Sequence, residues 1–202
     1  MRQSNHKQKL IASTVRTVAE FGIENATTKR ISTDAGVNEA ILFRLFESKE
    51  NLLNQAFACV GDELYGIVHD ALEIFDDNTL NYETQCRLLF ARCWEYLLKN
   101  ADKCRYYLRF YHSSYYAEHV KNRAESGTMG FFERILPCMP NLPSTEATKI
   151  LLLQLLDSAL GFAVRVIDGE LTDRSFATEQ VFRMLFNMVC EHERQLQREM
   201  VR

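Results

Sequence analysis

A short predicted helix over residues 39–46 carries the side chains that are best suited to chemistry. Its other apolar residues must pack inward, which leaves Glu39, Ala40, Phe43 and Arg44 to face outward. The planar fork of an arginine can pair with guanine or hold a phosphate through two hydrogen bonds. A glutamate can accept a hydrogen bond from the amino group of cytosine. The outward face therefore has the chemistry of a surface that contacts nucleic acid.

Two preceding helices would support that face. The spacing of apolar residues predicts a first helix over about residues 5–21, and Gly22 ends it because glycine accepts the left-handed conformation of a helix stop. Thr27 or Thr28 caps a second helix, which runs to about Ala35.

A tight turn then leads into the outward-facing helix. Gly36 permits the turn, Val37 fills it, and Asn38 caps the helix that follows. Ser48 caps a fourth helix, which we extend to about Phe75. Two short helices around such a turn predict a helix-turn-helix whose second helix enters a DNA major groove.

The same stretch closely resembles the DNA-binding head of the tetracycline-repressor-like (TetR) family of transcriptional regulators. The matching positions are Ile11, Phe21-Gly22, Thr27-Thr28, Ile31, Ala35-Gly36-Val37, Leu42-Phe43, Phe46, Ser48-Lys49-Glu50 and Leu52-Leu53. The similarity covers about the first quarter of the chain. It implies an all-α fold of about nine helices, with a three-helix head over residues 1–50. A larger helical domain for effector binding and dimerisation would occupy residues 51–202.

The resemblance also implies which residues contact DNA. They are Thr28, Asn38, Glu39, Ala40, Phe43, Arg44 and Lys49. Thr28 and Lys49 would contact phosphate, since a small polar side chain at a helix start and a lysine both suit an anion. The first residues of helix 39–46 would lie nearest the base edges.

Phe43 departs from the family pattern, which commonly has a tyrosine at this position. Without a hydroxyl, Phe43 can pack only on sugar or on a thymine methyl, and it can instead belong to the core. The other predicted contacts have alternatives too. Thr28 and Asn38 can be helix caps alone, and Arg44 and Lys49 can be solvated surface charges.

The charge distribution is consistent with phosphate contacts in the N-terminal part of the chain only. Residues 1–55 carry 8 Lys/Arg against 6 Asp/Glu, while the rest of the chain carries 16 against 21, for a net charge of −3. The start, Met1–Lys9, is polar and basic, which is unlike a signal peptide. We therefore expect a cytoplasmic protein.

The 6 cysteines are scattered without a CxxC pair, so we expect reduced thiols, with a redox sensor as the alternative. Cys86 and Cys93 share a helix face, but their Cα atoms would lie about 10 Å apart, too far for a disulfide without local unfolding.

Beyond residue 78, apolar periodicity predicts five further helices. They span about residues 82–99, 102–113, 117–136, 145–167 and 174–199. The most apolar run, 150–167, is interrupted by Gln154, Asp157 and Arg165, which favours a buried helix over a membrane span. The last two helices carry more apolar surface than one side needs, and together they predict a four-helix interface in a homodimer, with internal core as the alternative. The predicted interface residues are Leu151, Leu155, Phe162, Val181, Phe182, Leu185 and Val189.

A ligand cavity is expected among the helices of the second domain. Its predicted wall residues are Trp94, Tyr107, Phe110, Tyr111, Phe131 and Phe162, with Arg165 or His112 to orient a polar group. These aromatic residues can equally be plain core. The histidines show no metal-ligand spacing, and no common catalytic motif occurs, so we expect no metal, no cofactor and no enzyme activity.

The sequence thus predicts a dimeric DNA-binding regulator, a repressor that a small-molecule effector releases from a palindromic operator. A second hypothesis is a helical small-molecule-binding protein or enzyme with a vestigial head. A third is a module that binds another protein through its last two helices. The sequence identifies neither the effector nor the operator.

Overall fold

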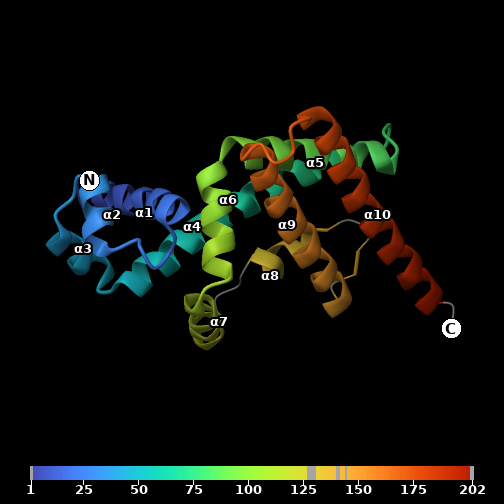
Figure 1. The fold of residues 1–202 in the computed structure, drawn as a ribbon. Coiled ribbons are helices and arrows are strands. Elements are labelled where there is room, and N and C mark those ends of the chain that lie inside the picture. Colours follow the sequence, from blue (N-terminus) through green and yellow to red (C-terminus); the bar gives the residue numbers. More distant parts are fainter. Residues whose placement is uncertain (1, 127–130, 140–141, 144, 201–202) are drawn as a thin grey trace. The chain divides into compact units, whose positions relative to one another are not determined.

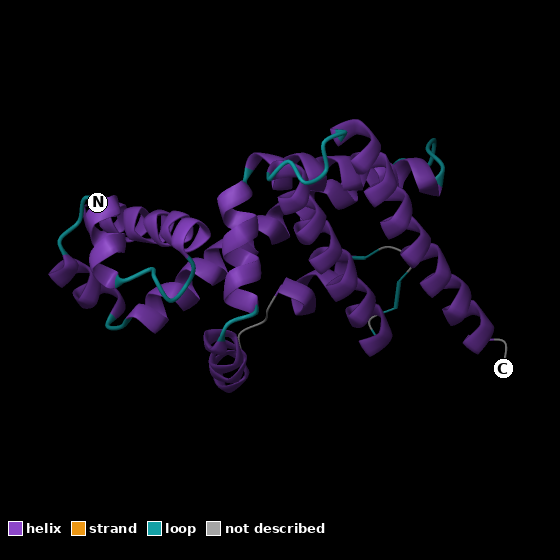
Figure 2. Cartoon of the chain, viewed as in Figure 1, coloured by secondary structure: helices purple, strands orange, loops and turns teal. Residues whose placement is uncertain are grey.

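The computed structural model describes residues 2–126, 131–139, 142–143 and 145–200, and their regular structure is entirely helical (Figures 1 and 2). The α-helices are α1 (Arg2–Phe21), α2 (Thr28–Ala35), α3 (Glu39–Phe46), α4 (Lys49–Ala71), α5 (Tyr82–Lys99), α6 (Ala101–Tyr111), α7 (Ser114–Ser126), α8 (Phe131–Ile135), α9 (Glu146–Ile167) and α10 (Arg174–Met200). Two 3-10 helices, η1 (Leu72–Asp76) and η2 (Leu136–Cys138), follow α4 and α8. The predicted all-α class is confirmed.

Local signals in the first fifty residues form the predicted helix-turn-helix. The side chain of Thr27, rather than that of Thr28, caps α2 by accepting from the backbone N–H of Arg30 at 3.2 Å. Gly36 has φ +62°, the left-handed conformation that ends α2 and opens the turn. Asn38 caps α3 by accepting from the N–H of Ala40 at 2.8 Å.

Contacts divide the chain into two units. We call Met1–Glu63 with Asp102–Thr128 the head unit, and Leu64–Ala101 with Met129–Arg202 the body unit. The division does not follow the predicted boundary at residue 50, because α6 packs with the head. The Tyr106 hydroxyl donates to the Leu53 carbonyl at 2.7 Å, and Arg109 donates to the Val18 carbonyl at 2.6 Å.

The centre of the head is a small apolar core closed by a buried hydrogen bond. Fully buried side chains from α1, α2 and α3 meet in it, and they include Leu10, Ile31 and Phe46. The Ser13 hydroxyl donates to the Ile31 carbonyl at 2.7 Å, which joins α1 to α2. This core holds one face of α3 against α1 and α2, and the opposite face of α3 is exposed to solvent.

In the body unit, α5 and α10 run in opposite directions along each other. Trp94 donates to Thr178 at 2.9 Å, while Tyr82, at the other end of α5, donates to Glu193 at 2.6 Å. The α9 helix packs against both α5 and α10. In the described part of the chain, α9 is also the one helix that is long and apolar enough, by length and composition, to cross a membrane.

Two predicted helices differ from those in the structure. The fourth helix ends at Ala71 rather than Phe75, and the chain continues as the 3-10 helix η1. In the segment predicted as one helix over residues 117–136, the structure has most of α7, which begins at Ser114, and the short α8. Gly127 and Gly130 of that segment, and Pro140 after it, lie outside the described residues.

Candidate nucleic-acid interface and apolar cavity

The α3 helix divides into a buried face and an exposed face. Leu42 and Phe46 are fully buried, whereas Phe43 is 46% exposed and Ala40 and Arg44 are also exposed. Phe43 is therefore outside the core, which removes one alternative reading of its role. Three of the predicted DNA-binding side chains lie together on the open side of the helix.

Thr28 and Glu39 are bonded to each other. The Thr28 hydroxyl, at the start of α2, donates to the Glu39 carboxylate, at the start of α3, at 2.5 Å. Both side chains are partly buried. A contact from Glu39 to cytosine would have to break or share this bond, so the pair acts first as a clamp between the two helices of the motif.

Lys49 joins the start of α4 to the segment that follows α1. Its ammonium group donates to the Ile23 carbonyl at 2.9 Å. Partial burial lowers the pKa of Lys49, and the nearby carboxylates of Glu24 and Glu50 act in the opposite direction. An ammonium group has three donors, so two remain for a phosphate.

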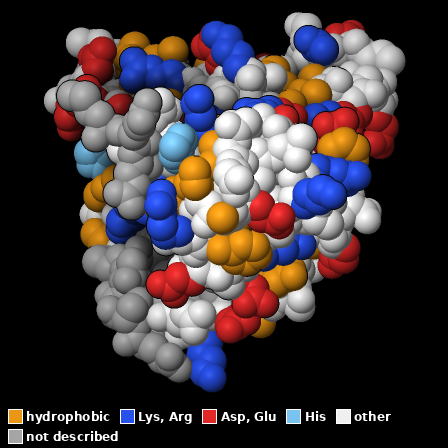
Figure 3. Space-filling model, turned by 90° about the vertical axis from the view of Figure 1, so that its left-hand side faces the viewer, with side chains coloured by type: hydrophobic (Ala, Val, Ile, Leu, Met, Phe, Trp, Pro, Cys, Tyr) orange, Lys and Arg blue, Asp and Glu red, His pale blue; other side chains and the backbone are white. Residues whose placement is uncertain are grey.

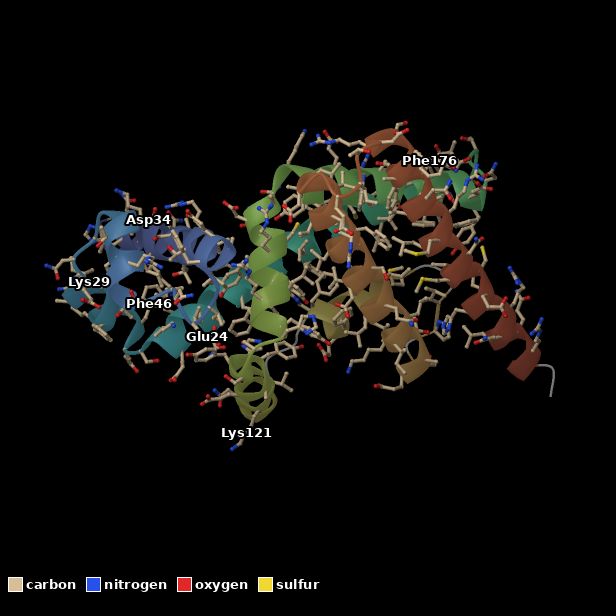
Figure 4. The ribbon with its side chains drawn as sticks, viewed as in Figure 1. Glu24, Lys29, Asp34, Phe46, Lys121 and Phe176 are labelled. Carbon is tan, nitrogen blue, oxygen red and sulfur yellow. The ribbon has the colours of Figure 1, made fainter. Side chains whose placement is uncertain are left out.

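Lys29 is a cation that the sequence analysis did not single out. It is exposed on the first turn of α2 and extends away from the ribbon (Figure 4). The neighbouring Arg30 is engaged elsewhere, because it donates to the Asn25 carbonyl at 3.0 Å and lies 4.2 Å from the centre of the Phe21 ring. The signal available in the sequence was a lysine directly after Thr28 at a helix start.

Charge of both signs covers the face of the molecule drawn in Figure 3, where lysine and arginine side chains are interspersed with acidic ones. Such a face has no strong single-sign field of its own. Phosphate binding by the head would therefore depend on individual exposed cations, such as Lys29 and Arg44.

Three predicted ligand residues belong to the aromatic core of the head unit. Phe57 stacks on Phe110 with ring centroids 4.5 Å apart and lies 4.8 Å from Tyr107. Tyr111 packs on Tyr107 and on Tyr116, at 6.4 Å and 4.5 Å. Tyr107, Phe110 and Tyr111 therefore lie outside the cavity described below.

Three further predicted ligand residues also lie elsewhere. Trp94 is buried and donates its indole N–H to Thr178. Phe162 is partly exposed, with the Arg165 guanidinium 5.7 Å from the centre of its ring. His112, the alternative polar group, is exposed in the head unit.

A cavity of about 200 Å³ does lie within the body unit, and Phe131 is the predicted ligand residue that lines it. Its walls come from the second half of α4, from η1, α5 and α8, from the segment after η2, and from α9 and α10. Leu64, Leu156 and Phe182 represent its aliphatic and aromatic lining. Among the described residues, no lysine, arginine, histidine or carboxylate lines it.

The polar groups in the wall are two thiols and two phenols. Cys86 and Cys93 line the cavity, and burial raises the pKa of each thiol to about 11. Burial also raises the pKa of Tyr82, whose hydroxyl donates to Glu193. Cys86, Cys93 and Tyr82 are therefore protonated and uncharged at neutral pH. The described residues include all 6 cysteines, and none of them forms a disulfide bond.

The residues predicted for the dimer interface are largely interior to one chain. Leu151, Val181, Phe182 and Leu185 are buried in the single chain. Leu155, Phe182, Leu185 and Val189 line the cavity. Phe162 remains partly exposed on α9. Elsewhere on the last two helices, Ile150 is 54% exposed and Phe176 is 63% exposed.

Comparison with known proteins agrees with this architecture. Residues 10–56 match the model of the bacterial regulatory proteins of the tetR family. No curated protein sequence matches the chain.

Solved structures resemble the chain over nearly its whole length. A putative tetR family transcription regulator from Shewanella sp. PV-4 shares 17% identity, with 90% of this chain and 96% of that chain covered and a TM-score of 0.67. A TetR family transcription regulator from Marinobacter aquaeolei VT8 shares 20% identity, with 93% and 98% covered and a TM-score of 0.65. The multidrug binding protein EbrR, solved with imidazole, shares 16% identity, with 90% and 93% covered and a TM-score of 0.59.

The fold is that of the solved TetR-type regulators named above, with a helix-turn-helix near its N-terminus. The head thus matches the tetR family model over residues 10–56. The body resembles the solved regulators in fold.

Proposed function

We propose that the protein is a homodimeric transcriptional repressor that leaves its operator when a small molecule enters the body cavity. The observation that carries this proposal is the division of α3. Leu42 and Phe46 anchor the helix, while Ala40, Phe43 and Arg44 stand exposed in the position of a recognition helix. Because its partner is genomic DNA, we assign the protein to the cytoplasm.

The proposed DNA contacts are of two kinds, those that recognise bases and those that position the protein on the phosphate backbone. Arg44 is the proposed base reader, with Phe43 and Ala40 packing beside it on thymine methyls or sugar. Lys29, Lys49 and the Asn38 end of α3 are the proposed phosphate contacts. We assign the Thr28–Glu39 pair to positioning, because their hydrogen bond sets the spacing of α2 and α3.

A dimer through α9 and α10 is supported by apolar side chains of these helices that remain exposed in the single chain. Only 28% of the apolar stretch of α9 is buried. Ile150 and Phe162 on α9, with Phe176 at the start of α10, are the proposed contacts. They replace the predicted residues that are interior to the body unit. A twofold dimer would place two α3 helices on half-sites about one helical turn, roughly 34–36 Å, apart or somewhat more.

Coupling between cavity and head is assigned to α4. Its first residues, Lys49–Glu63, belong to the head unit, and Leu64, Ile67 and Val68 line the cavity. A molecule that binds one arrangement of these wall residues better than another shifts the population of head positions. EbrR, which shares the fold, is described as a multidrug binding protein, which supports a small-molecule effector.

A gel shift with DNA fragments upstream of the gene and of its neighbours tests the proposal. We expect a retarded complex with at least one fragment, which is lost when a cavity ligand is added. Absence of any complex with folded protein would refute DNA binding. A complex that a bound ligand leaves unchanged would refute the coupling alone.

A further inference from the structure

The wall of the body cavity is apolar, whereas charged side chains form ion pairs next to it. We propose that the cavity selects an electrically neutral, largely apolar molecule, with room for one larger than benzene, and rejects carboxylates and ammonium ions of the same shape. The inference rests on the proposed function insofar as this molecule is the effector, but binding to the cavity can be measured without DNA.

The wall combines aliphatic and aromatic side chains. Leu152, Leu156 and Ala159 of α9 supply branched and small apolar groups. On α5 and α10, Phe90 and Phe182 have ring centroids 5.5 Å apart, and Phe182 stacks on Phe186 at 5.6 Å. Rings together with aliphatic side chains favour a ligand with its own apolar or aromatic body.

The charged groups next to this wall already have partners. Arg87 lies 4.0 Å from the centre of the Phe182 ring, and its guanidinium donates to Glu179 at 2.6 Å. Glu193 accepts from the Tyr82 hydroxyl at 2.6 Å. None of these three charged groups lines the cavity. A charged ligand would therefore lose its water without gaining a counter-charge, which carries a large penalty.

The wall offers almost no polar surface to a ligand. The Tyr82 hydroxyl donates to Glu193 and is also hydrogen-bonded with the Cys86 side chain. The Cys86 and Cys93 thiols are weak donors, and their raised pKa values keep them protonated. The chemical class that follows is an uncharged, largely apolar molecule.

The volume of the cavity leaves room for more than one benzene ring. An apolar cavity of about 150 Å³ holds one benzene molecule. The body cavity, at about 200 Å³, has room for a larger body, such as two fused rings or a branched chain.

A matched series on the wild-type protein tests the charge selectivity. Isothermal titration at pH 7 would compare 1-naphthylmethanol, 1-naphthoate and 1-naphthylmethylammonium, which share one ring system and differ in charge. We expect the alcohol to bind and each ion to bind at least about 100-fold more weakly, because its charge would be buried without a partner. Equal or tighter binding of either ion, or no binding of the alcohol, would overturn the proposal.

Two matched tryptophan substitutions locate the binding. Ala159→Trp fills the cavity from α9 and should abolish binding of the alcohol, while Ala91→Trp, at an exposed position of α5, should leave it unchanged. Circular dichroism and thermal melting confirm that both variants fold. Retained binding in folded Ala159→Trp would overturn the location. The charge series uses wild-type protein, so it decides the ligand class even if Ala159→Trp does not fold.

The outcomes separate this inference from the proposed function. If the alcohol binds with the expected selectivity and operator affinity stays unchanged, the ligand class stands and the coupling to DNA fails. If an ion binds better than the alcohol and releases DNA, the proposed function stands and this inference fails.

Discussion

The head unit and the body unit place their functional residues in opposite ways. In the head, the proposed contacts lie within residues 29–49, on α2, at the start and along the exposed face of α3, and at the start of α4. In the body, the residues that line the cavity lie between Leu64 and Val189 on several elements, and most of them are apolar. A surface made from neighbouring residues leaves a local pattern in the sequence, whereas an interior assembled from distant helices does not.

The same contrast explains what the comparisons match. The family model covers residues 10–56, within the head. The solved regulators follow the whole chain in fold, although the ones named above share only 16–20% identity. Many apolar sequences can fill such a body, so its fold persists while its wall residues, and the ligand that they accept, can change.

Breaking the proposed dimer should have the largest effect on DNA binding. Ile150→Asp puts a charge on the exposed face of α9 and should separate the protomers. Loss of the second head should weaken operator binding by about 10²–10⁴-fold, because simultaneous binding at two half-sites is lost. Sedimentation equilibrium and gel shifts measure the two effects.

Leu88→Asp is the matched control for the dimer, since Leu88 is 42% exposed on α5. It should leave both self-association and operator affinity unchanged. A monomeric wild-type protein, or an Ile150→Asp variant that remains dimeric, would show that α9 is not the interface.

Removal of the proposed base reader should come next. Arg44→Ala should cost about 1–3 kcal/mol per half-site and relax the preference at one base position. Arg92→Ala, at an exposed arginine of the body unit, is the control and should have no effect. Unchanged affinity and base preference in Arg44→Ala would mean that α3 is docked differently from our proposal.

Two lysines of the head should behave differently from each other. Lys29→Ala should weaken binding equally for all sequences and reduce the salt slope of the affinity by about one, because one phosphate contact is lost. Lys49→Ala should also lower the melting temperature, since it removes the hydrogen bond to the Ile23 carbonyl. Salt titrations of affinity and thermal melts distinguish these effects. A salt slope that Lys29→Ala leaves unchanged would exclude it as a phosphate contact.

The smallest expected effect concerns the stability of the body unit. Glu179 accepts from Arg87 and Arg183, and these bonds lower the pKa of its carboxyl to about 2 from an ordinary 4.5. A carboxyl whose pKa is lowered by folding stabilises the folded state at a pH above its ordinary pKa. That contribution is lost as the pH falls towards the pKa of the folded protein. Glu179→Gln should therefore lower the melting temperature at pH 7, and the difference should shrink between about pH 4.5 and 2.

Glu118→Gln, at an exposed position of α7, serves as the control for that pH dependence. It should melt like the wild type throughout. A Glu179→Gln variant whose melting temperature differs from the wild type by a constant amount at every pH would mean that the ion pairs do not cause the difference.

The parts of the fold that could be predicted were those with local causes. A glycine in the left-handed conformation at Gly36 and a cap at Asn38 specify the turn within a few residues. By contrast, the bond between Thr28 and Glu39 joins two side chains eleven positions apart. Periodicity indicates which face of a helix is apolar but not what that face meets.

The predicted ligand site shows this limit most clearly. Tyr107 and Phe110 have the composition of a cavity wall, but they stack on Phe57 in the head unit instead. Phe182 and Leu185 were predicted at a dimer interface for the same reason, namely an apolar surplus, and they line the cavity. Only tertiary contacts distinguish core, cavity and interface among side chains of the same kind.

A footprint on the upstream DNA tests the central claim most directly. Protection of one fragment by wild-type protein should cover two half-sites related by a twofold axis, with centres about one helical turn or somewhat more apart. The Arg44→Ala variant should lose that protection at the same protein concentration. No protected site with folded, dimeric protein, or equal protection by wild type and Arg44→Ala, would contradict the account.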